Sequence, residues 1–397
     1  MSFAIAGSCR RLLFKQARID TFATWMGIEK INISEFVNLA TRYPVIDVRS
    51  PGEFQHAHIP GAYSLPLFTD QERATVGTLY KQEGRQAAIL SGLDYFGTKM
   101  RRMVEDIAGQ YETLLPGSQV SNEKEHTKII LVHCWRGGMR SAGVAWLLDL
   151  YGFKVYTLAG GYKSFRHWVF AQFLQPGPIH ILGGYTGSGK TDLLHRLQSN
   201  GKHAVIDLEG LAVHKGSAFG AIGLEKQPSQ EMFENKLALA FFRIRHQEIS
   251  NAEAQTNLPN PQKPIWMEDE SQRIGVVNIP LVLWEHMRKQ PVFFLDIPFE
   301  ERLNYLTETY GKLNKGDLAA AITRIQKRLG GLETKTALGH LVEGDIKSCF
   351  GVLLYYYDKK YKKSLSNRED AEKIIKHIPC DRVDVKNNAV RLNNALN

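Results

Sequence analysis

The sequence lacks the hallmarks of membrane-spanning, disulfide-bonded and disordered proteins. Its 397 residues contain no apolar run of about 18 residues, the length that a membrane-spanning helix needs. The four cysteines form no C-x-x-C pair, which argues against a zinc site or a disulfide framework and favours a reducing, cytoplasmic setting. There is no internal repeat and no low-complexity tract. With 43% hydrophobic and 23% charged residues the chain is typical of globular proteins, and its length predicts two to three domains at ~150 residues each.

The chain carries an excess of positive charge. Lys plus Arg number 50 and Asp plus Glu 41, which gives a net charge of +9. Such a surplus favours a polyanionic partner, with nucleic acid as the first candidate. Residues 1–30 form a basic N-terminal extension, in which Met1–Ile19 has no acidic residue. Its composition resembles a transit peptide, but a poorly ordered tail, or an upstream start codon ahead of Met26, is the favoured interpretation.

Short β-branched runs alternate with helical patterns along the rest of the chain. Strands are predicted at Pro44–Arg49, Ile129–Cys134, Phe153–Leu158, Ile179–Leu182 and Val292–Asp296. This alternation predicts an α/β fold in which helices cover both faces of parallel sheets. The turn-rich Gln175–Pro178 separates a first unit, residues 31–172, from a second unit at 173–345. Residues 346–397 are predicted to form a helical, basic and aromatic C-terminal segment.

A cysteine stands in a Gly-rich loop, Cys134-Trp-Arg-Gly-Gly-Met-Arg-Ser141, between a predicted strand and a predicted helix. Backbone N–H groups of such a turn and of the helix start bind anions, and Arg136 and Arg140 add charge. Together they are expected to lower the pKa of Cys134 and keep it a nucleophilic thiolate. The loop leaves two chemistries open. One is sulfur-group transfer, and the other is phosphate-ester hydrolysis by a C-x5-R loop that ends at Arg140.

The second constellation is Gly184-Tyr-Thr-Gly-Ser-Gly-Lys-Thr191, which matches the phosphate-binding pattern G-x-x-x-x-G-K-[ST] between a strand and a helix. Gly184, Gly187 and Gly189 permit close approach of the backbone to phosphate. Lys190 would reach phosphate oxygens, and Thr191 would ligate Mg²⁺.

Acidic residues that end later apolar runs are candidates for the same metal. These are Asp207 and Asp269, the latter within the Glu268-Asp269 pair. Mg²⁺ is therefore an expected cofactor, whereas no bound redox cofactor is expected. A solvated strand end is an equally good interpretation of each carboxylate taken alone.

Basic and aromatic residues gather near the C-terminus, where lysines could bind phosphates and tyrosines could stack on unpaired bases. The candidates for RNA binding are Arg324, Lys327, Arg328, Tyr357, Lys359 and Lys360. A solvated helix face with tyrosines packed beneath it is the competing interpretation.

Several segments carry a family resemblance. Asp47-Val-Arg-Ser-Pro-Gly-Glu-Phe54 and His58-Ile-Pro-Gly-Ala62 resemble the signature of rhodaneses, in which an Asp47–Arg49 ion pair would hold the loop. With Glu72–Gly77, Gly160–Lys163, Asp207–Gly220 and Glu268–Ser271, the chain from about Ile33 to about Lys363 resembles the tRNA 2-selenouridine synthase family. The resemblance implies a rhodanese-like parallel-sheet domain followed by a P-loop NTPase-like α/β domain with a helical C-terminal part.

The resemblance also implies a two-step reaction at the wobble uridine, position 34, of the tRNAs for Lys, Glu and Gln. First 2-thiouridine is S-geranylated with geranyl diphosphate, and then selenium from selenophosphate replaces the geranylated sulfur. Cys134 would accept selenium as an S-selanyl intermediate, while Arg136 and Arg140 bind the phosphate of the donor. A selenophosphate-supplying enzyme is then an implied partner. Our own hypothesis is that the phosphate loop, with Mg²⁺, grips the diphosphate of geranyl diphosphate.

Two other interpretations fit the motifs. One is a sulfurtransferase or C-x5-R phosphatase fused to a regulatory NTPase domain, which would act without RNA. The other is a nucleotide-gated tRNA-binding protein without chemistry, in which Cys134 would be dispensable. The segment Gly210–Gly220 favours the synthase, because neither alternative has a use for it.

Overall fold

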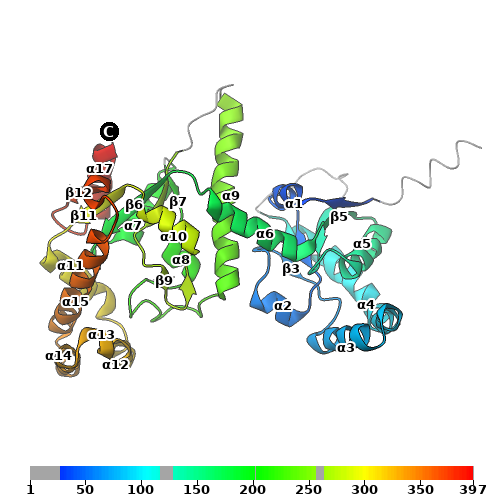
Figure 1. Cartoon of the computed structure of the whole chain (residues 1–397), viewed down its shortest axis with the longest axis horizontal. Coiled ribbons are helices and arrows are strands. Elements are labelled where there is room, and N and C mark those ends of the chain that lie inside the picture. The colour runs from blue at the N-terminus through cyan, green and yellow to red at the C-terminus, as the bar shows by residue number, and fades with distance from the viewer. Residues whose placement is uncertain (1–26, 117–127, 202, 256–262, 397) are drawn as a thin grey trace, which may run out of the picture. The chain divides into compact units, whose positions relative to one another are not determined.

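The computed structural model describes residues 27–116, 128–201, 203–255 and 263–396 (Figure 1). The basic residues of Met1–Ile19 lie outside this part of the chain, as does Met26. The chain divides into two compact units, Met1–Trp168 and Val169–Asn397. In the described residues, no helix is long and apolar enough to cross a membrane.

The first unit is built on a five-stranded parallel sheet with the strand order β1-β5-β4-β2-β3. Its strands are β1 (Ile28–Ile31), β2 (Val45–Asp47), β3 (Tyr63–Ser64), β4 (Ile129–His133) and β5 (Lys154–Leu158). Its helices are α1 (Ile33–Leu39), α2 (Pro51–His56), α3 (Asp70–Gln82), α4 (Arg85–Leu114), α5 (Met139–Tyr151) and α6 (Gly161–Leu174), whose last turns belong to the second unit.

Burial explains which strands the sequence revealed. Val45–Asp47 is fully buried, and Ile129–His133 is buried except for its first residue, because neighbouring strands and helices cover both faces. Both were predicted from their apolar runs. The edge strand β1 has exposed charged residues at its centre, so it has no apolar run by which the sequence could reveal it. The predicted extension 1–30 therefore overlaps an unpredicted strand.

The second unit has its own five-stranded parallel sheet, in the order β12-β11-β6-β8-β7, and an antiparallel β9–β10 hairpin. Its strands are β6 (Ile179–Gly184), β7 (Ala204–Val205), β8 (Ile265–Glu268), β9 (Arg273–Ile274), β10 (Val277–Asn278), β11 (Val292–Asp296) and β12 (Ile375–Pro379). Helices around the sheet are α7 (Lys190–Ser199), α8 (Leu208–Ala212), α9 (Gln230–Gln255), α10 (Leu281–Arg288), α11 (Phe299–Tyr310), α16 (Ala371–Ile374) and α17 (Val385–Leu396).

A helical subdomain completes the second unit with a core of its own, which includes Leu318, Ile322, Leu341 and Leu353. Its helices are α12 (Lys315–Arg324), α13 (Gln326–Leu329), α14 (Gly331–Glu343) and α15 (Ile346–Ser366). The helical C-terminal part of the predicted fold is thereby confirmed.

The end of the chain differs from the prediction of a helical segment over 346–397. Strand β12 pairs in parallel with β11 and forms an edge of the P-loop sheet, and α17 packs against α7. Only Ile378 in this strand is fully buried, while Lys376 and His377 are exposed. The strand therefore lacks the apolar run by which buried strands are recognised.

Candidate active sites

Cys134 follows β4 directly and lies in the turn that leads into α5. The residue is only 3% exposed, and its Sγ lies 3.2 Å from the hydroxyl oxygen of Ser141. Burial raises the pKa of the thiol. Hydrogen bonds from the Ser141 side chain and from the backbone N–H groups of Gly138, Ser141 and Arg136 outweigh this effect, so the pKa lies below its ordinary value. The geometry therefore favours a thiolate in a cradle of N–H donors.

A second turn holds this loop in place. The backbone N–H of Tyr162 donates to the carbonyl oxygen of Cys134 over 2.8 Å. Gly161 adopts φ 61°, and a Cβ atom there would lie 2.4 Å from the same oxygen and from the backbone nitrogen of Gly137. Only glycine fits this close approach. The Gly160–Lys163 segment thus supports the cysteine loop.

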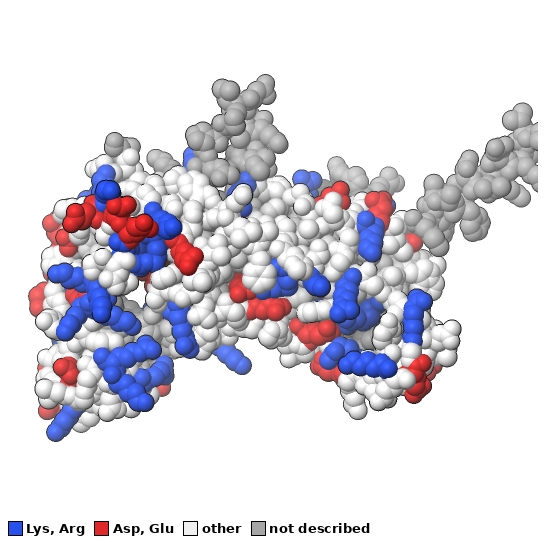
Figure 2. All heavy atoms as spheres, in the orientation of Figure 1, with Lys and Arg blue, Asp and Glu red and all other residues white. Residues whose placement is uncertain are grey.

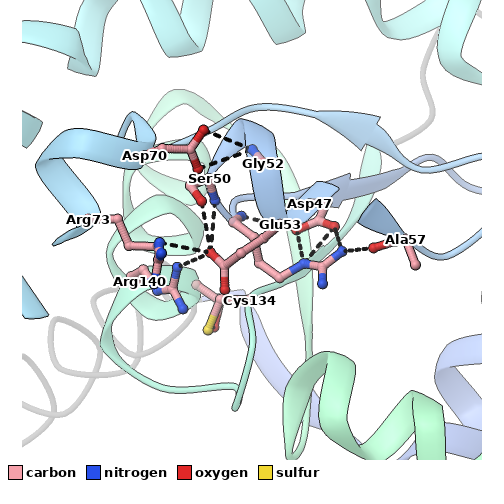
Figure 3. Close-up of polar contacts among 11 residues, drawn as sticks. Asp47, Ser50, Gly52, Glu53, Ala57, Asp70, Arg73, Cys134 and Arg140 are labelled. Atoms are coloured by element: carbon pink, nitrogen blue, oxygen red, sulfur yellow. Dashed lines mark hydrogen bonds and ion pairs between the residues drawn. The ribbon is translucent and has the colours of Figure 1, made fainter. Parts of the chain in front are cut away.

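The guanidinium of Arg140 is held by Glu53, a residue of α2 (Figure 3). Arg140 Nη1 donates to Glu53 Oε2 over 3.1 Å, and the same carboxylate accepts the backbone N–H of Ser50. Burial raises the pKa of Glu53, but the positive charge of Arg140 and the Ser50 hydrogen bonds bring it below its usual value. Glu53 is therefore ionised and fixes the orientation of Arg140. Arg136, the other arginine predicted to bind phosphate, is exposed in the turn.

The predicted Asp47–Arg49 ion pair is confirmed as a buried structural element. Arg49 Nη2 lies 2.7 Å from Asp47 Oδ2 and also donates to the carbonyl oxygen of Ala57. The guanidinium covers the ring of Tyr162 at 3.8 Å from its centroid. Both charged residues are at most 1% exposed, so they fasten α2 and the Tyr162 turn rather than offer a reactive group.

The phosphate loop has the predicted strand–loop–helix setting between β6 and α7. Lys190 Nζ donates to the carbonyl oxygen of Gly184 over 2.9 Å, which holds the lysine over the loop. Gly187 and Gly189 adopt φ of 80° and 69°. A Cβ atom on Gly187 would lie 2.8 Å from Leu306 of α11, so the loop is also packed tightly from outside.

An acidic pair lies beside the phosphate loop. Thr191 donates its hydroxyl to Glu209 Oε2 over 2.8 Å, and the Glu209 and Glu270 carboxyl groups are hydrogen-bonded to each other. Burial, reinforced by the charge of Glu209, raises the pKa of Glu270 to about 8 against the opposing charge of Lys190. Burial raises the pKa of Glu209 as well. The pair therefore shares a proton near neutral pH.

The two aspartates predicted as metal ligands have other partners. Asp207 caps α8, accepting the backbone N–H of Gly210 over 2.7 Å, and its second oxygen accepts a hydrogen bond from a histidine ring. Asp269 forms an ion pair with Arg368 and accepts the hydroxyl of Tyr361 over 2.6 Å. Both carboxylates already have hydrogen-bond or ion-pair partners that the sequence does not reveal. The prediction that they bind Mg²⁺ together with Thr191 is therefore not supported.

The residues at the loop nevertheless fit Mg²⁺. The described residues contain no group of three or more His, Cys, Asp or Glu side chains that would form a complete metal cage. A phosphate-bound Mg²⁺ needs only one or two carboxylates besides waters and phosphate oxygens. Thr191 and Glu209 would be its oxygen ligands near the charge of Lys190, and Glu270 is hydrogen-bonded to Glu209. The signal that could have found Glu209 is its position on the first turn of α8.

A small apolar pocket with a cavity volume of about 20 Å³ adjoins the phosphate loop. It is lined by four aromatic residues, three leucines and two hydroxyl residues, namely Phe219, Tyr310, Phe350, Tyr357, Leu306, Leu353, Leu354, Thr186 and Ser217. Thr186 belongs to the phosphate loop itself. Burial raises the pKa of Tyr310 to about 12 and the charge of Glu209 adds to the rise, so this tyrosine lies near the acidic pair.

The basic candidates lie on the surface of the helical subdomain. Arg324, Lys327 and Arg328 are exposed on α12 and α13, and Lys359 and Lys360 are exposed on α15. Figure 2 shows Lys and Arg side chains gathered over the region in which Figure 1 places α12–α15. The three basic residues of this stretch are divided between the end of α12, which holds Arg324, and the short helix α13, which holds Lys327 and Arg328.

Tyr357 is the exception among the predicted RNA-binding residues. It is half-buried, its hydroxyl accepts the backbone N–H of Ala218 over 3.2 Å, and burial raises its pKa to about 12. It lines the apolar pocket, so the prediction that it stacks on bases is wrong. Tyr355, two residues earlier and therefore on another face of α15, is 73% exposed.

A cysteine seated in a turn whose N–H groups point at its sulfur, and a phosphate-loop motif, each on its own parallel sheet, define a rhodanese-like domain joined to a P-loop domain. The family comparisons agree with this class. Residues 32–167 match the rhodanese-like domain, and residues 177–379 match the tRNA 2-selenouridine synthase AAA domain.

The chain is similar to proteins named tRNA 2-selenouridine synthase. It is 36% identical to one from Hydrogenovibrio crunogenus, over 72% of this chain and 76% of that protein. It is 35% identical to one from Nitrosomonas europaea, over 67% of this chain and 63% of that protein. It is 38% identical to one from Salmonella agona, over 67% of this chain and 66% of that protein. The chain belongs to the tRNA 2-selenouridine synthase family.

Proposed function

We propose that this chain converts 2-thiouridine at the wobble position of tRNA to 2-selenouridine in two steps. The P-loop unit would attach a geranyl group to the sulfur, and the rhodanese-like unit would supply selenium. The observation that carries the proposal is the cradle of Cys134, whose N–H donors and lowered thiol pKa suit a nucleophile that meets an anionic donor.

In the first step the 2-thio sulfur attacks the allylic carbon of geranyl diphosphate. A sulfur–carbon bond forms as the carbon–oxygen bond breaks, diphosphate leaves with the electron pair, and the ring N3 proton passes to solvent. Lys190, the loop N–H groups and the N-terminus of α7 would bind the diphosphate. Thr191 and Glu209 would hold Mg²⁺, which neutralises charge on the leaving group.

The apolar pocket supports geranyl diphosphate over a nucleotide as the ligand. A base needs hydrogen-bonding partners for its edges, yet the hydroxyl oxygens of Tyr357 and Ser217 already accept the backbone N–H groups of Ala218 and Phe219. The Ser217 and Tyr310 side chains are also hydrogen-bonded to each other. A hydrocarbon chain needs only the aromatic and leucine side chains. With Thr186 at its wall, the pocket would widen to receive the chain of a ligand whose diphosphate lies in the loop.

A series of diphosphates tests this assignment. At about 0.8 kcal/mol for each buried CH₂ group, shortening geranyl to dimethylallyl diphosphate should weaken binding by up to about a thousandfold. Inorganic diphosphate should bind more weakly still. Tight binding of ATP or GTP that geranyl diphosphate fails to displace would show that the loop is a nucleotide site.

In the second step a selenium nucleophile derived from selenophosphate adds to C2, and geranyl thiol leaves. Alkylation makes this possible because it converts the sulfur into a thiol-type leaving group. Arg136, Arg140 and the loop N–H groups would bind the phosphate of the donor. The donor itself would come from a selenophosphate-supplying enzyme. The exposed basic residues of α12, α13 and α15 would bind the tRNA backbone.

The deciding experiment is mass spectrometry of wobble nucleosides from a 2-thiouridine tRNA incubated with geranyl diphosphate and selenophosphate. Wild type should yield 2-selenouridine. Cys134→Ser should stop at the geranylated nucleoside, and Lys190→Ala should leave 2-thiouridine. An unchanged tRNA together with turnover of thiosulfate or a phosphate ester would instead favour a sulfurtransferase or phosphatase fused to a regulatory NTPase.

A further inference from the structure

The turn Val213–Gly220, which follows α8, has no part in the chemistry described so far. Gly216 in this turn adopts φ 62°. A Cβ atom on Gly216 would lie 2.8 Å from carboxylate oxygens of both Glu209 and Glu270. Because these contacts leave room only for glycine, the turn packs directly against the acidic pair beside the phosphate loop.

The same turn places a lysine at the edge of the apolar pocket. Ser217 and Phe219 of the turn line this pocket. Lys215 is exposed, and its Nζ lies 5.8 Å from the ring centroid of Tyr310, which lines the same pocket. The ammonium group therefore lies at the rim of the pocket, on a turn that is fixed against the acidic pair.

Further cations lie around this rim. Burial lowers the pKa of His214 in the same turn, and the charge of Arg324 adds to the effect, so Arg324 lies near the turn. Lys360 comes three residues after the pocket residue Tyr357 and is therefore its neighbour on the surface of α15. Burial lowers the pKa of Lys360, and the charge of Arg328 adds to the effect, so these two cations lie near each other.

We call Lys215, Arg324, Arg328 and Lys360 the rim cations. None of them forms an ion pair with another residue of the described part of the chain. Positive charges that gather without carboxylates between them favour an anion that spans them. A diphosphate in the phosphate loop would already be neutralised by Lys190, N–H groups and a metal. A ligand with several phosphates along its length fits the rim cations better, and the backbone of tRNA is such a ligand.

We propose that the rim cations bind the sugar–phosphate backbone of the tRNA anticodon loop, with Lys215 on a phosphate that flanks the wobble uridine. This inference rests on the proposed function and deepens it, because it brings the RNA to the geranylation site. Phosphate contacts fix the position of a nucleic acid without reading its bases. The wobble nucleotide, held at the rim, then turns its 2-thio sulfur toward the pocket. Lys215 is a positioning residue, because it contacts the RNA backbone and not the reacting atoms.

Lys215→Ala tests the proposal against a matched control, Lys289→Ala. Lys289 is also exposed and has no ion pair with a described residue. It precedes β11, whereas the phosphate loop follows the parallel neighbour β6, so the two lie at opposite edges of the sheet. The substrate is an anticodon stem–loop with 2-thiouridine at the wobble position.

The lost contact should be visible in KM and in the salt dependence of binding. Lys215→Ala should raise the KM for this RNA about tenfold and leave kcat nearly unchanged, since a backbone contact is equal in the ground and transition states. The slope of log binding constant against log salt concentration should become shallower by about one. Lys215→Arg should restore both values, Lys289→Ala should change neither, and geranyl diphosphate should bind all these proteins equally.

Removing charge from the RNA tests where Lys215 makes its contact. An uncharged methylphosphonate replaces, in turn, each of the two phosphates that flank the wobble uridine. One replacement should weaken binding to wild type and Lys289→Ala about tenfold but leave binding to Lys215→Ala unaffected, because that contact is already lost. In wild type, bound RNA should also protect Lys215, and not Lys289, from acetylation. This protection gives an answer even if Lys215→Ala fails to fold.

Three outcomes would overturn the inference. They are equal salt slopes for wild type and Lys215→Ala, additive effects of this variant with both methylphosphonates, and acetylation of Lys215 that bound RNA does not slow. Weaker binding of geranyl diphosphate with an unchanged KM for RNA would also overturn it, because Lys215 would then belong to the diphosphate site. Binding and protection need no turnover, so they decide the inference even if the chain does not geranylate RNA. That failure would contradict the proposed function alone.

Discussion

Replacing Gly161 by alanine tests how the cysteine loop is supported. The new Cβ atom would lie 2.4 Å from the carbonyl oxygen of Cys134 and from the backbone nitrogen of Gly137, and both are main-chain atoms. The left-handed φ of 61° adds about 1–2 kcal/mol for a non-glycine residue, and overpacking adds about 1–3 kcal/mol. The first unit should therefore lose about 2–5 kcal/mol of unfolding free energy, and the cradle around the sulfur should widen.

Gly152 provides a matched control in the same unit. It also has a positive φ, 111°, but a Cβ atom there would meet nothing within 4 Å. Gly152→Ala should therefore show backbone strain alone, about 1–3 kcal/mol. Denaturant unfolding measures both losses, and the pH dependence of Cys134 alkylation, followed by peptide mass spectrometry, measures the thiol pKa.

The two variants should differ at the cysteine. Gly161→Ala should raise the pKa of Cys134, because displaced N–H groups no longer stabilise the thiolate. Gly152→Ala should leave that pKa unchanged. If Gly161→Ala is no less stable than Gly152→Ala and alkylates with the wild-type pH profile, the turn at Gly161 does not shape the cradle, and the reasoning is refuted.

Three further results are expected. Glu209→Gln should weaken Mg²⁺-dependent binding of geranyl diphosphate about tenfold to a hundredfold in calorimetry, whereas Asp207→Asn should lower stability without changing that dependence. Arg328→Ala should make the slope of log binding constant against log salt concentration shallower by about one for tRNA, and Arg328→Lys should restore the wild-type slope. Equal slopes for wild type and both variants would show that Arg328 does not contact the tRNA. Cys134, whose pKa is lowered, should still be alkylated at pH values below the ordinary thiol range. Cys349, whose pKa burial raises to about 11, should be alkylated only at high pH. If the alkylation rates of the two cysteines depend on pH in the same way, the assignment is contradicted.

The parts of the site that could be predicted are those encoded by contiguous residues. Cys134–Ser141 and Gly184–Thr191 each occupy one turn between a strand and a helix, and both adjoining strands are buried apolar runs. Spacing within one turn fixes which N–H groups and charges meet there. The sequence therefore sufficed to predict both strand–loop–helix segments and the two α/β units.

The parts that escaped prediction depend on contacts between distant segments. Arg140 meets Glu53 only because α2 lies beside the start of α5, and nothing at either position indicates the pairing. Glu209 and Glu270 follow different strands, and the sheet order brings them to the same loop. Asp269 was a more obvious metal candidate than Glu209 or Glu270, yet its carboxylate forms an ion pair with Arg368.

Helix α15 shows why composition alone misassigned Tyr357. On one side of this helix Tyr361 accepts the backbone N–H of Gly184, and Asp358 pairs with Arg302, which itself donates to the carbonyl oxygen of Thr186. These residues and Tyr357 support the phosphate loop and its pocket.

The lysines of the same stretch lie on the exposed side of α15. A helix presents different faces at successive residues, so a mixed run of tyrosines and lysines divides into a packed side and a solvated side. The proposed RNA surface and the phosphate loop therefore share one rigid element, and substitutions on α15 must be separated by face before an effect on geranylation is attributed to RNA binding.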